Sequence, residues 1–334
     1  MDFMTSIHID KNESLIQYGQ KIMLMGSCFT EHIGNALESH KFDILQNPHG
    51  ILFDTNSVTK SIVSYIDKQL YQDSDLFYMN ELWQSWQHHS RFAHIEKNEA
   101  IQLINQSQES AHEFLKHADW LIITLGSSFI YQLTDESINF GNPGFKVANC
   151  HRAPANWFNK KMLEITETIA LLDTLYHRVK KFNPKIKFIF TISPVRHLRD
   201  GVVDNNRSKA RLIEAVHHTV NKFEHVYYFP AYELVIDVLR DYRFFDIDFA
   251  HPNYQATQFV LEKFIASYFD DTTQKLYQDI HQIITARKHR PSQPNTNAHR
   301  TFLASNFNKI KAIEKLYPFI NFNEEKQYFQ NMIP

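Results

Sequence analysis

The chain has 334 residues, of which 43% are hydrophobic and 22% charged, so we expect a folded protein with one large domain or one domain with appendages. Its formal charge is −2, without the basic excess of a general nucleic-acid binder. Two cysteines, neither in a C-x-x-C, do not make a disulfide framework. The first residues lack the pattern of a signal peptide, and no apolar run approaches the ~18 residues of a membrane span. We therefore expect a cytoplasmic protein with neither nucleic-acid nor membrane partners.

Apolar runs predict the strands of a central sheet. Three runs rich in β-forming residues and one shorter run have the near-continuous apolar character of strands covered on both faces. They span residues 21–25, 119–125, 186–192 and 226–229. Helical patterns lie at 30–40, 57–68, 97–117, 159–181, 207–223, 231–240 and 253–269. The alternation of strands and helices predicts a doubly wound α/β sheet with right-handed crossovers.

Two irregular stretches interrupt this alternation, at 76–95 and 129–150. Both adjoin predicted sheet strands, where binding loops usually sit. A further helix is expected at 272–288, followed by a loop and a helical, aromatic tail at 299–334. We predict a domain over 1–270 that contains the two insertions, and a helical C-terminal extension over 271–334. The sequence leaves the oligomeric state open.

Ser27 stands directly after the first predicted strand and before a helix, in the segment Gly26-Ser27-Cys28-Phe29. Chemistry in open α/β sheets occurs at the carboxyl ends of strands. Gly26 permits a tight turn, and the N–H groups of the following helix favour a developing oxyanion. Ser27 is therefore a candidate nucleophile. Two alternatives stay open: Ser27 only caps the helix, or Cys28 is the nucleophile.

The segment Asp248-Phe-Ala-His251-Pro supplies the groups that a hydroxyl nucleophile needs. A spacing of three residues in a turn brings both side chains to one side, so Asp248 can orient the ring of His251 toward a serine. Asp246 is a competing orienter whose offset of five residues fits the turn less well. The alternative is a helix-entry loop in which the acid caps and the imidazole is solvated.

Polar residues near other predicted strand ends are candidates for supporting roles. Gly50, in Asn47-Pro-His49-Gly50, can aim its N–H at a substrate oxygen, although the same residues suit a simple turn. Asn149 and His151 offer an amide and an imidazole to a pocket. Arg196 and His197 follow a core strand and suit an anionic or polyhydroxyl substrate, with structural ion pairing as the alternative for the arginine.

No pattern in the chain indicates a metal or a cofactor. The 19 histidines form adjacent pairs such as His88-His89 rather than H-E-x-x-H, and no H-x-E with C-x-x-C occurs. A Walker A loop and a G-x-G-x-x-G are absent, and eight glycines in the whole chain disfavour a dinucleotide loop. The G-x-S-x-G of α/β-hydrolases is absent as well. We therefore expect no cofactor and no metal.

Six motifs in order resemble the GSCFA domain family, which is named after the first of them. The motifs begin at Gly26, Asn47, Thr124, Asn149, Ser193 and Asp248, and the resemblance extends from about residue 20 to 320. The fifth position of the first motif is Thr30 rather than alanine. The family looks like a branch of the SGNH (GDSL-like) hydrolases. The resemblance therefore implies a three-layer α/β/α, flavodoxin-like fold with a central parallel sheet.

The resemblance also implies roles for individual residues. Ser27 is implied as the nucleophile, with Asp248 and His251 as the dyad that activates it. Oxyanion donors are implied from the Ser27 backbone, from Gly50 and from an asparagine. The superfamily's Gly-x-Asn-Asp is replaced here by Gly126-Ser-Ser-Phe129, so Asn149 or Ser128 would have to supply that donor.

Three functional hypotheses follow. The first is a serine-dependent esterase that removes acyl groups, most simply acetyl groups, from a carbohydrate. The second is an acyltransferase that uses the same site in glycan or cell-surface biosynthesis. The third is a non-catalytic glycan-binding protein on the same fold, against which the complete set of Ser27, Asp248 and His251 argues. The motifs do not identify the acyl group or the acceptor.

Overall fold

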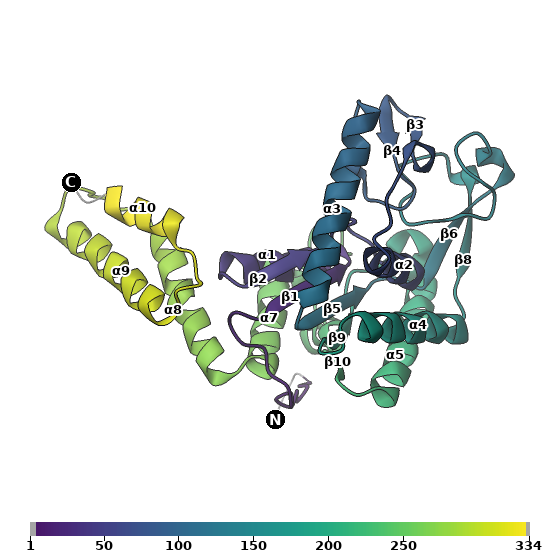
Figure 1. Cartoon of the computed structure of the whole chain (residues 1–334). Helices are drawn as coiled ribbons and strands as arrows, with labels where there is room; N and C mark the ends of the chain where they lie inside the picture. The colour runs from purple at the N-terminus through teal and green to yellow at the C-terminus, as the bar shows by residue number, and fades with distance from the viewer. Residues whose placement is uncertain (1–4, 332–334) are drawn as a thin grey trace. The chain divides into compact units, whose positions relative to one another are not determined.

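The computed structural model describes residues 5–331 (Figure 1). The strands are β1 (Lys21–Gly26), β2 (Asp43–Gln46), β3 (Phe77–Met79), β4 (Leu82–Gln84), β5 (Trp120–Leu125), β6 (Phe129–Leu133), β7 (Lys146–Val147), β8 (Phe158–Met162), β9 (Lys187–Ile192) and β10 (Val226–Tyr228). The helices are α1 (Cys28–Ser39), α2 (Thr55–Ile66), α3 (Lys97–His117), α4 (Ile165–Phe182), α5 (Gly201–Lys222), α6 (Ala231–Glu233), α7 (Tyr254–Tyr268), α8 (Asp271–Lys288), α9 (Asn297–Leu316) and α10 (Asn323–Asn331). A π-helix at Leu234–Leu239 continues α6.

A central five-stranded sheet has the order β10-β9-β5-β1-β2. The pairs β10–β9, β9–β5 and β5–β1 are parallel. Counted along the chain within this sheet, the order is 2-1-3-4-5, that of flavodoxin-like folds. The strand order reverses between β1 and β5, and ligands of such sheets bind outside the carboxyl ends of the strands at this switch point. The predicted fold class, with its parallel core, is confirmed.

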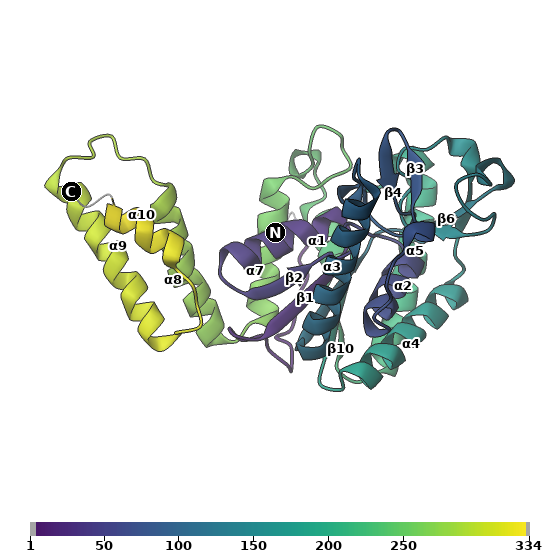
Figure 2. The same ribbon diagram turned by 45° about the horizontal axis from the view of Figure 1, so that its top comes forward.

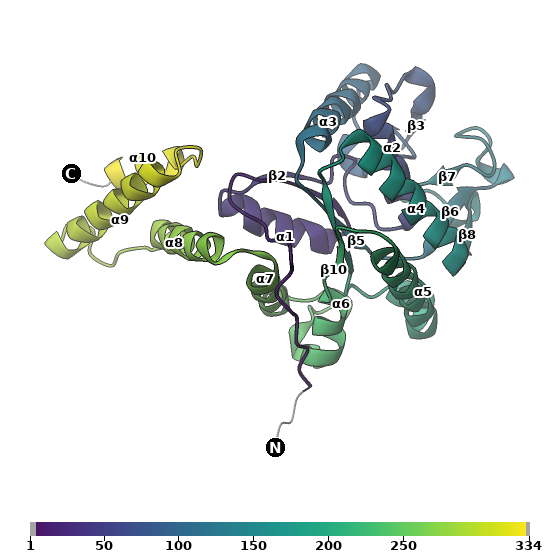
Figure 3. The ribbon, with the colours of Figure 1, turned by 60° about the horizontal axis from the view of Figure 1, so that its bottom comes forward.

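The main core covers one face of this sheet. Alternate side chains of β1 and β5, such as Met25 and Ile123, point into it and are fully buried. They pack against apolar side chains of α2, α3, α4 and α5, and Figure 3 shows α2, α4 and α5 in a row along this face. Side chains of the opposite face, such as Leu24 and Ile189, are equally buried. Burial on both faces explains why these strands are apolar throughout.

The two insertions form small antiparallel sheets. The first contains the hairpin β3–β4, and the second the order β7-β6-β8. Figures 1 and 2 both show them side by side. They share one apolar cluster that includes Phe77 and Trp86 of the first insertion and Leu133 and Val147 of the second.

Two helices begin six residues away from their predicted starts. Residues 158–162 form the strand β8 rather than the start of a helix; their side chains alternate between half-buried and exposed, as in an edge strand. Helix α4 begins after them, where Glu164 and Glu167 form a reciprocal capping box. Helix α5 begins at Gly201, six residues before its predicted start.

The Cα positions divide the chain into two compact units. The first comprises residues 1–9, 21–34 and 44–263, and the second comprises 10–20, 35–43 and 264–334. The second unit has its own apolar cluster, built from α8, α9 and α10 and including Ile280, Leu303 and Phe329. In the same unit the almost buried carboxylate of Glu325 pairs with Lys41 at 2.9 Å. Among the described residues, no helix has both the length and the apolarity to span a membrane.

Candidate active site

The turn that carries Ser27 is fixed by close packing. Gly26 ends β1 with φ at +139°, and a Cβ at this position would lie 2.2 Å from the Thr124 carbonyl oxygen of β5. The Gly26 N–H donates to Oδ1 of the buried Asn47 at 2.8 Å. Only glycine fits this approach of two strands. Ser27 is thereby held at the carboxyl end of β1, at the switch point of the sheet.

The hydroxyl of Ser27 is buried and unpaired. The residue is 4% exposed, and its Oγ has no hydrogen-bond partner among the described residues. It therefore does not cap α1, although the Ser27 carbonyl accepts from the Thr30 N–H. A buried polar atom without a partner costs free energy and in a native structure calls for an explanation. A hydroxyl kept for a reacting substrate is such an explanation.

Asp248 and His251 form a hydrogen-bonded pair. His251 Nδ1 lies 2.6 Å from Asp248 Oδ2, and the N–H groups of Ala250 and His251 donate to Asp248 Oδ1. These two N–H bonds, together with the imidazole, lower the pKa of Asp248 to about 2. A carboxylate on Nδ1 leaves Nε2 as the free ring nitrogen, the arrangement required of a general base. Asp246 contacts the pair only through its backbone.

One cavity of about 640 Å³ brings the serine and the pair together. Ser27, Asp248 and His251 all line it, as do the predicted substrate-binding residues Arg196 and His197. Ser27 Oγ and the imidazole do not share a hydrogen bond here. Catalytic hydrogen bonds often tighten only when substrate is bound. The cavity has the size of a small-molecule site.

A buried residue that the sequence analysis missed bonds two residues that line this cavity. Lys209 of α5 is 1% exposed, and its ammonium donates to the carbonyls of Gly126 and Ser193 at 2.6 Å each. These carbonyls follow β5 and β9, and His197 Nε2 also bonds the Gly126 carbonyl at 2.8 Å. Burial lowers the pKa of Lys209 to about 7. Lys209 thus ties together the strand ends that face Ser27.

Cys28 also lines the cavity, but its environment disfavours a thiolate. Burial raises the pKa of the Cys28 thiol, and the neighbouring Glu31 raises it further. The thiolate is the nucleophilic form of cysteine. The structure therefore favours Ser27 over Cys28 as the nucleophile.

Three predicted residues do not reach the cavity. The Gly50 N–H, a predicted oxyanion donor, donates to the Asn47 carbonyl at 2.7 Å, and Gly50 does not line the cavity. Asn149 accepts from the His151 N–H within a turn, and His151 Nε2 bonds the Ser85 carbonyl. Neither lines the cavity. Their segment packs against the apolar cluster of the insertions. The order of strands along the sequence predicts which residues meet at the sheet edge, but it does not predict where this segment packs.

Ser128 does not fill the missing oxyanion position either. Its N–H and its hydroxyl both lie within hydrogen-bond distance of Ser208 Oγ, at 2.8 and 3.0 Å, and it is fully buried. The donors next to Ser27 are at the first turn of α1, where N–H groups have no intrahelical partner. Among residues 5–331, no group of three or more His, Cys, Asp or Glu side chains is placed to hold a metal ion.

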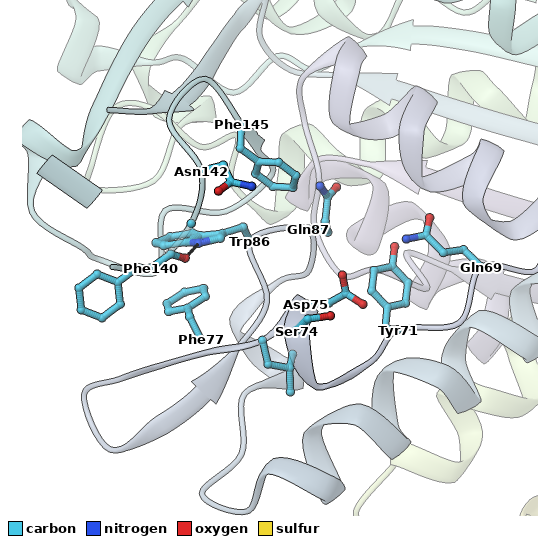
Figure 4. A pocket seen from close by; sticks show the side chains of 12 residues that line it. Gln69, Tyr71, Ser74, Asp75, Phe77, Trp86, Gln87, Phe140, Asn142 and Phe145 are labelled. Carbon is cyan, nitrogen blue, oxygen red and sulfur yellow. Dashed lines mark hydrogen bonds between the residues drawn. The ribbon is translucent and has the colours of Figure 1, made fainter. Parts of the chain in front are cut away.

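A second cavity, of about 270 Å³, is lined by the insertions and by the segment 69–75 just before the first of them (Figure 4). It shares no lining residue with the first. Gln87, Asn142 and Phe145 lie on one side of it, and Tyr71 and Asp75 on the other. Amide side chains and aromatic rings thus face a common space.

Comparison with known proteins identifies the family. The model of the GSCFA family matches residues 21–264, and that of the C-terminal domain of GSCFA domain proteins matches residues 280–334. The chain belongs to the GSCFA family. No curated protein matches it.

Several solved structures are similar to this GSCFA protein. A family 3 carbohydrate esterase from Talaromyces cellulolyticus is 12% identical, with 79% of this chain and 99% of that chain covered and a TM-score of 0.35. A family 3 carbohydrate esterase from Clostridium thermocellum is 10% identical, with coverages of 74% and 94% and a TM-score of 0.35. The acetyl xylan esterase Est2A from Butyrivibrio proteoclasticus is 12% identical, with coverages of 75% and 64% and a TM-score of 0.38.

Proposed function

We propose that this GSCFA protein is a serine-dependent esterase of the SGNH type. The observation that carries the proposal is the unpaired, buried hydroxyl of Ser27 at the sheet's switch point, in one cavity with the Asp248–His251 pair. Other buried hydroxyls of the described residues also lack a partner, such as those of Thr30 and Thr191, but only that of Ser27 lines this cavity. A nucleophile, a base and an orienting carboxylate are the groups that acyl transfer requires.

In the proposed reaction, Ser27 Oγ attacks the carbonyl carbon of the ester while His251 Nε2 takes the hydroxyl proton. Asp248 holds the imidazole through Nδ1 and stabilises the imidazolium. The negative charge that develops on the carbonyl oxygen is met at the start of α1 by the N–H of Cys28, because the Ser27 N–H donates to the Thr124 carbonyl at 3.3 Å. His251 then protonates the leaving alcohol. Water, deprotonated by His251, releases the acid and restores Ser27.

The test is hydrolysis of p-nitrophenyl acetate together with labelling by a fluorophosphonate. We expect Ser27→Ala to abolish labelling and to lower kcat by about 1,000-fold or more. His251→Ala should lower kcat comparably. Cys28→Ala should still be labelled, which separates the two neighbouring nucleophiles. Full activity of both Ser27→Ala and His251→Ala would refute the proposal, and failure of the wild type to label would favour a non-catalytic glycan-binding role.

We further propose that the natural ester is an O-acyl, most simply O-acetyl, group of a carbohydrate. The second cavity supports this part, because the side chains of Gln87 and Asn142 offer amide donors and acceptors suited to sugar hydroxyls. One insertion serves both cavities: Tyr131 of β6 lines the first, and the segment after β6, including Phe145, lines the second.

Acetate release from acetylated xylo-oligosaccharides, compared with p-nitrophenyl acetate, tests the carbohydrate part. We expect Gln87→Ala and Asn142→Ala to lower kcat/KM for the oligosaccharide more than for the small ester, which is too short to occupy both cavities. Equal effects on both esters would contradict it. An acyltransferase would use the same acyl-enzyme, and product analysis with an added sugar acceptor separates transfer from hydrolysis.

A further inference from the structure

The acidic groups of the Ser27 cavity are already neutralised. Asp200 lines the cavity and forms an ion pair with Lys160. Asp248 is held by His251 and by two backbone N–H groups. Neither carboxylate is free to serve as the counterion of another cation.

Two guanidinium groups of the cavity have no such partner. Arg196 and Arg199 both line it, and neither side chain pairs with a carboxylate among the described residues. His197, the other basic side chain between them, is half-buried, and its Nε2 is used by the Gly126 carbonyl. Burial lowers the pKa of His197, which favours its neutral form. The uncompensated charge at the cavity is therefore positive and is carried by the two arginines.

The setting of Arg196 leaves its donors available. Its guanidinium stacks over the Phe245 ring at 4.6 Å and lies 5.9 Å from the centre of the Tyr242 ring. Stacking covers the faces of a guanidinium but leaves its in-plane N–H groups free. Its backbone N–H donates to the Ala250 carbonyl at 3.1 Å, beside the dyad. The backbone of Arg196 is therefore held beside the dyad, and its side chain belongs to a residue that lines the same cavity as His251.

We propose that the ester taken by this cavity carries an anionic group, a carboxylate, which Arg196 and Arg199 bind while Ser27 faces the acyl carbon. Planar guanidiniums match carboxylates with paired hydrogen bonds, which are stronger than neutral ones. The inference rests on the proposed esterase function and specifies its substrate class as acidic esters, such as acylated sugar acids.

The probes are 4-acetoxybenzoate and its methyl ester, which release the same acetyl group but differ in charge. For each we measure kcat/KM, divided by its rate of hydrolysis by hydroxide. We expect the wild type to prefer the anion by about 10–100-fold, a ratio that Arg199→Gln and Arg196→Gln bring toward one. Raising NaCl from 50 to 500 mM should reduce the preference. Arg207→Gln on α5, outside the cavity, is the matched control and should retain it.

Arg199→Gln and a further variant, Arg196→Lys, keep the inference testable if Arg196→Gln loosens the loop that it stacks on. Arg199 is exposed and stacks on no ring, so its variant should fold normally. Arg196→Lys keeps the charge without the planar donors and should retain part of the preference. Equal normalised kcat/KM for both esters in the wild type would overturn the inference.

Binding to Ser27→Ala separates this inference from the proposed function, because it needs no turnover. We expect 4-acetoxybenzoate to bind this variant at least about 10-fold more tightly than the methyl ester. If the anion binds preferentially but neither ester is hydrolysed by the wild type, the esterase proposal fails and the anion site stands. If both esters are hydrolysed but bind equally, the anion site fails alone.

Discussion

Ser27 and His251 line the same cavity, but the segments that carry them are held in different ways. The turn at Ser27 lies between two core strands, with Gly26 fixed by Asn47 and by the Thr124 carbonyl. The loop at His251 is a surface segment in which the imidazole side chain is 44% exposed and Ile247 is 96% exposed. The nucleophile thus belongs to the rigid sheet, whereas its base belongs to a loop held by local hydrogen bonds.

This difference indicates where the site can adjust. Phe249, within the loop, has φ at +55°, and the loop is closed by the Asp246 N–H bond to the His251 carbonyl. Few buried contacts restrain such a segment, so it is drawn from the less stable part of the molecule. The missing hydrogen bond between Ser27 and His251 is therefore expected to form by movement of the loop rather than of the sheet. The predictions below test this contrast.

The largest expected effect is a loss of kcat on substitution of Asp248, in the exposed loop that carries His251. Asp248→Asn keeps the size of the side chain but removes the charge that orients and stabilises the imidazole, so we expect kcat to fall by about 100–10,000-fold. The assay is p-nitrophenyl acetate hydrolysis. Asp246→Asn is the matched control, because Asp246 touches the pair only through its backbone and should remain active. A larger loss at Asp246 than at Asp248 would exchange their assignments.

In the buried turn that carries Ser27, the largest effect on stability is expected at Gly26. In Gly26→Ala the new methyl group meets the Thr124 carbonyl at 2.2 Å in a left-handed backbone conformation, so we expect a loss of about 3 kcal/mol or more in the free energy of unfolding. Gly144→Ala is the control: φ is +81°, but nothing lies within 4 Å, so about 1 kcal/mol is expected.

Urea unfolding followed by tryptophan fluorescence measures both variants. All four tryptophans, at 83, 86, 120 and 157, lie in the unit that contains the site. The signal therefore reports this unit alone. Equal losses at Gly26 and Gly144 would mean that strain in the backbone, and not the contact with β5, fixes the turn.

Much of the central sheet and of the turn at Ser27 could be predicted from sequence, but less of the residues that surround them. The apolar strands and the Gly26-Ser27 turn are encoded by local sequence patterns, so both could be predicted. Lys209 left a weaker signal, a lysine on the same helical face as the buried Leu212 and Val216, which a helical plot would reveal. The use of the Gly50 N–H by Asn47, and the place of His151 in the insertion cluster, depend on tertiary packing that spacing does not encode.

Lys209, which bonds the carbonyls that follow β5 and β9, offers a pH-dependent test of the buried part of the molecule next to the site. Burial lowers its pKa to about 7 in the folded chain, whereas in the unfolded chain a lysine keeps its proton to about pH 10.4. Between pH 7 and 9 the unfolded state therefore binds more protons, so the free energy of unfolding rises with pH, by about 2 kcal/mol at most. The rise should be absent from Lys209→Met.

The measurement is urea unfolding at pH 7, 8 and 9, read as the wild type minus Lys209→Met. The Cys150 thiol, whose pKa is raised by burial, titrates in both proteins and cancels in the difference. The Cys28 thiol interacts with Lys209, so both proteins carry Cys28→Ala. Parallel stability curves would show that Lys209 keeps its charge through its two carbonyl bonds.

The smallest expected effect is on stability, and it compares substitution of Ser27 in the turn with substitution of His251 in the surface loop. The hydroxyl of Ser27 is buried without a partner, so its removal in Ser27→Ala should raise the free energy of unfolding by about 1 kcal/mol, although the activity is lost. The side chain of His251 is half-exposed, and His251→Ala should change the same quantity by less than about 0.5 kcal/mol. Urea unfolding at pH 7 measures both. A loss of stability in Ser27→Ala would mean that the hydroxyl has a partner in solution, and the reason for assigning the nucleophile to the rigid half would disappear.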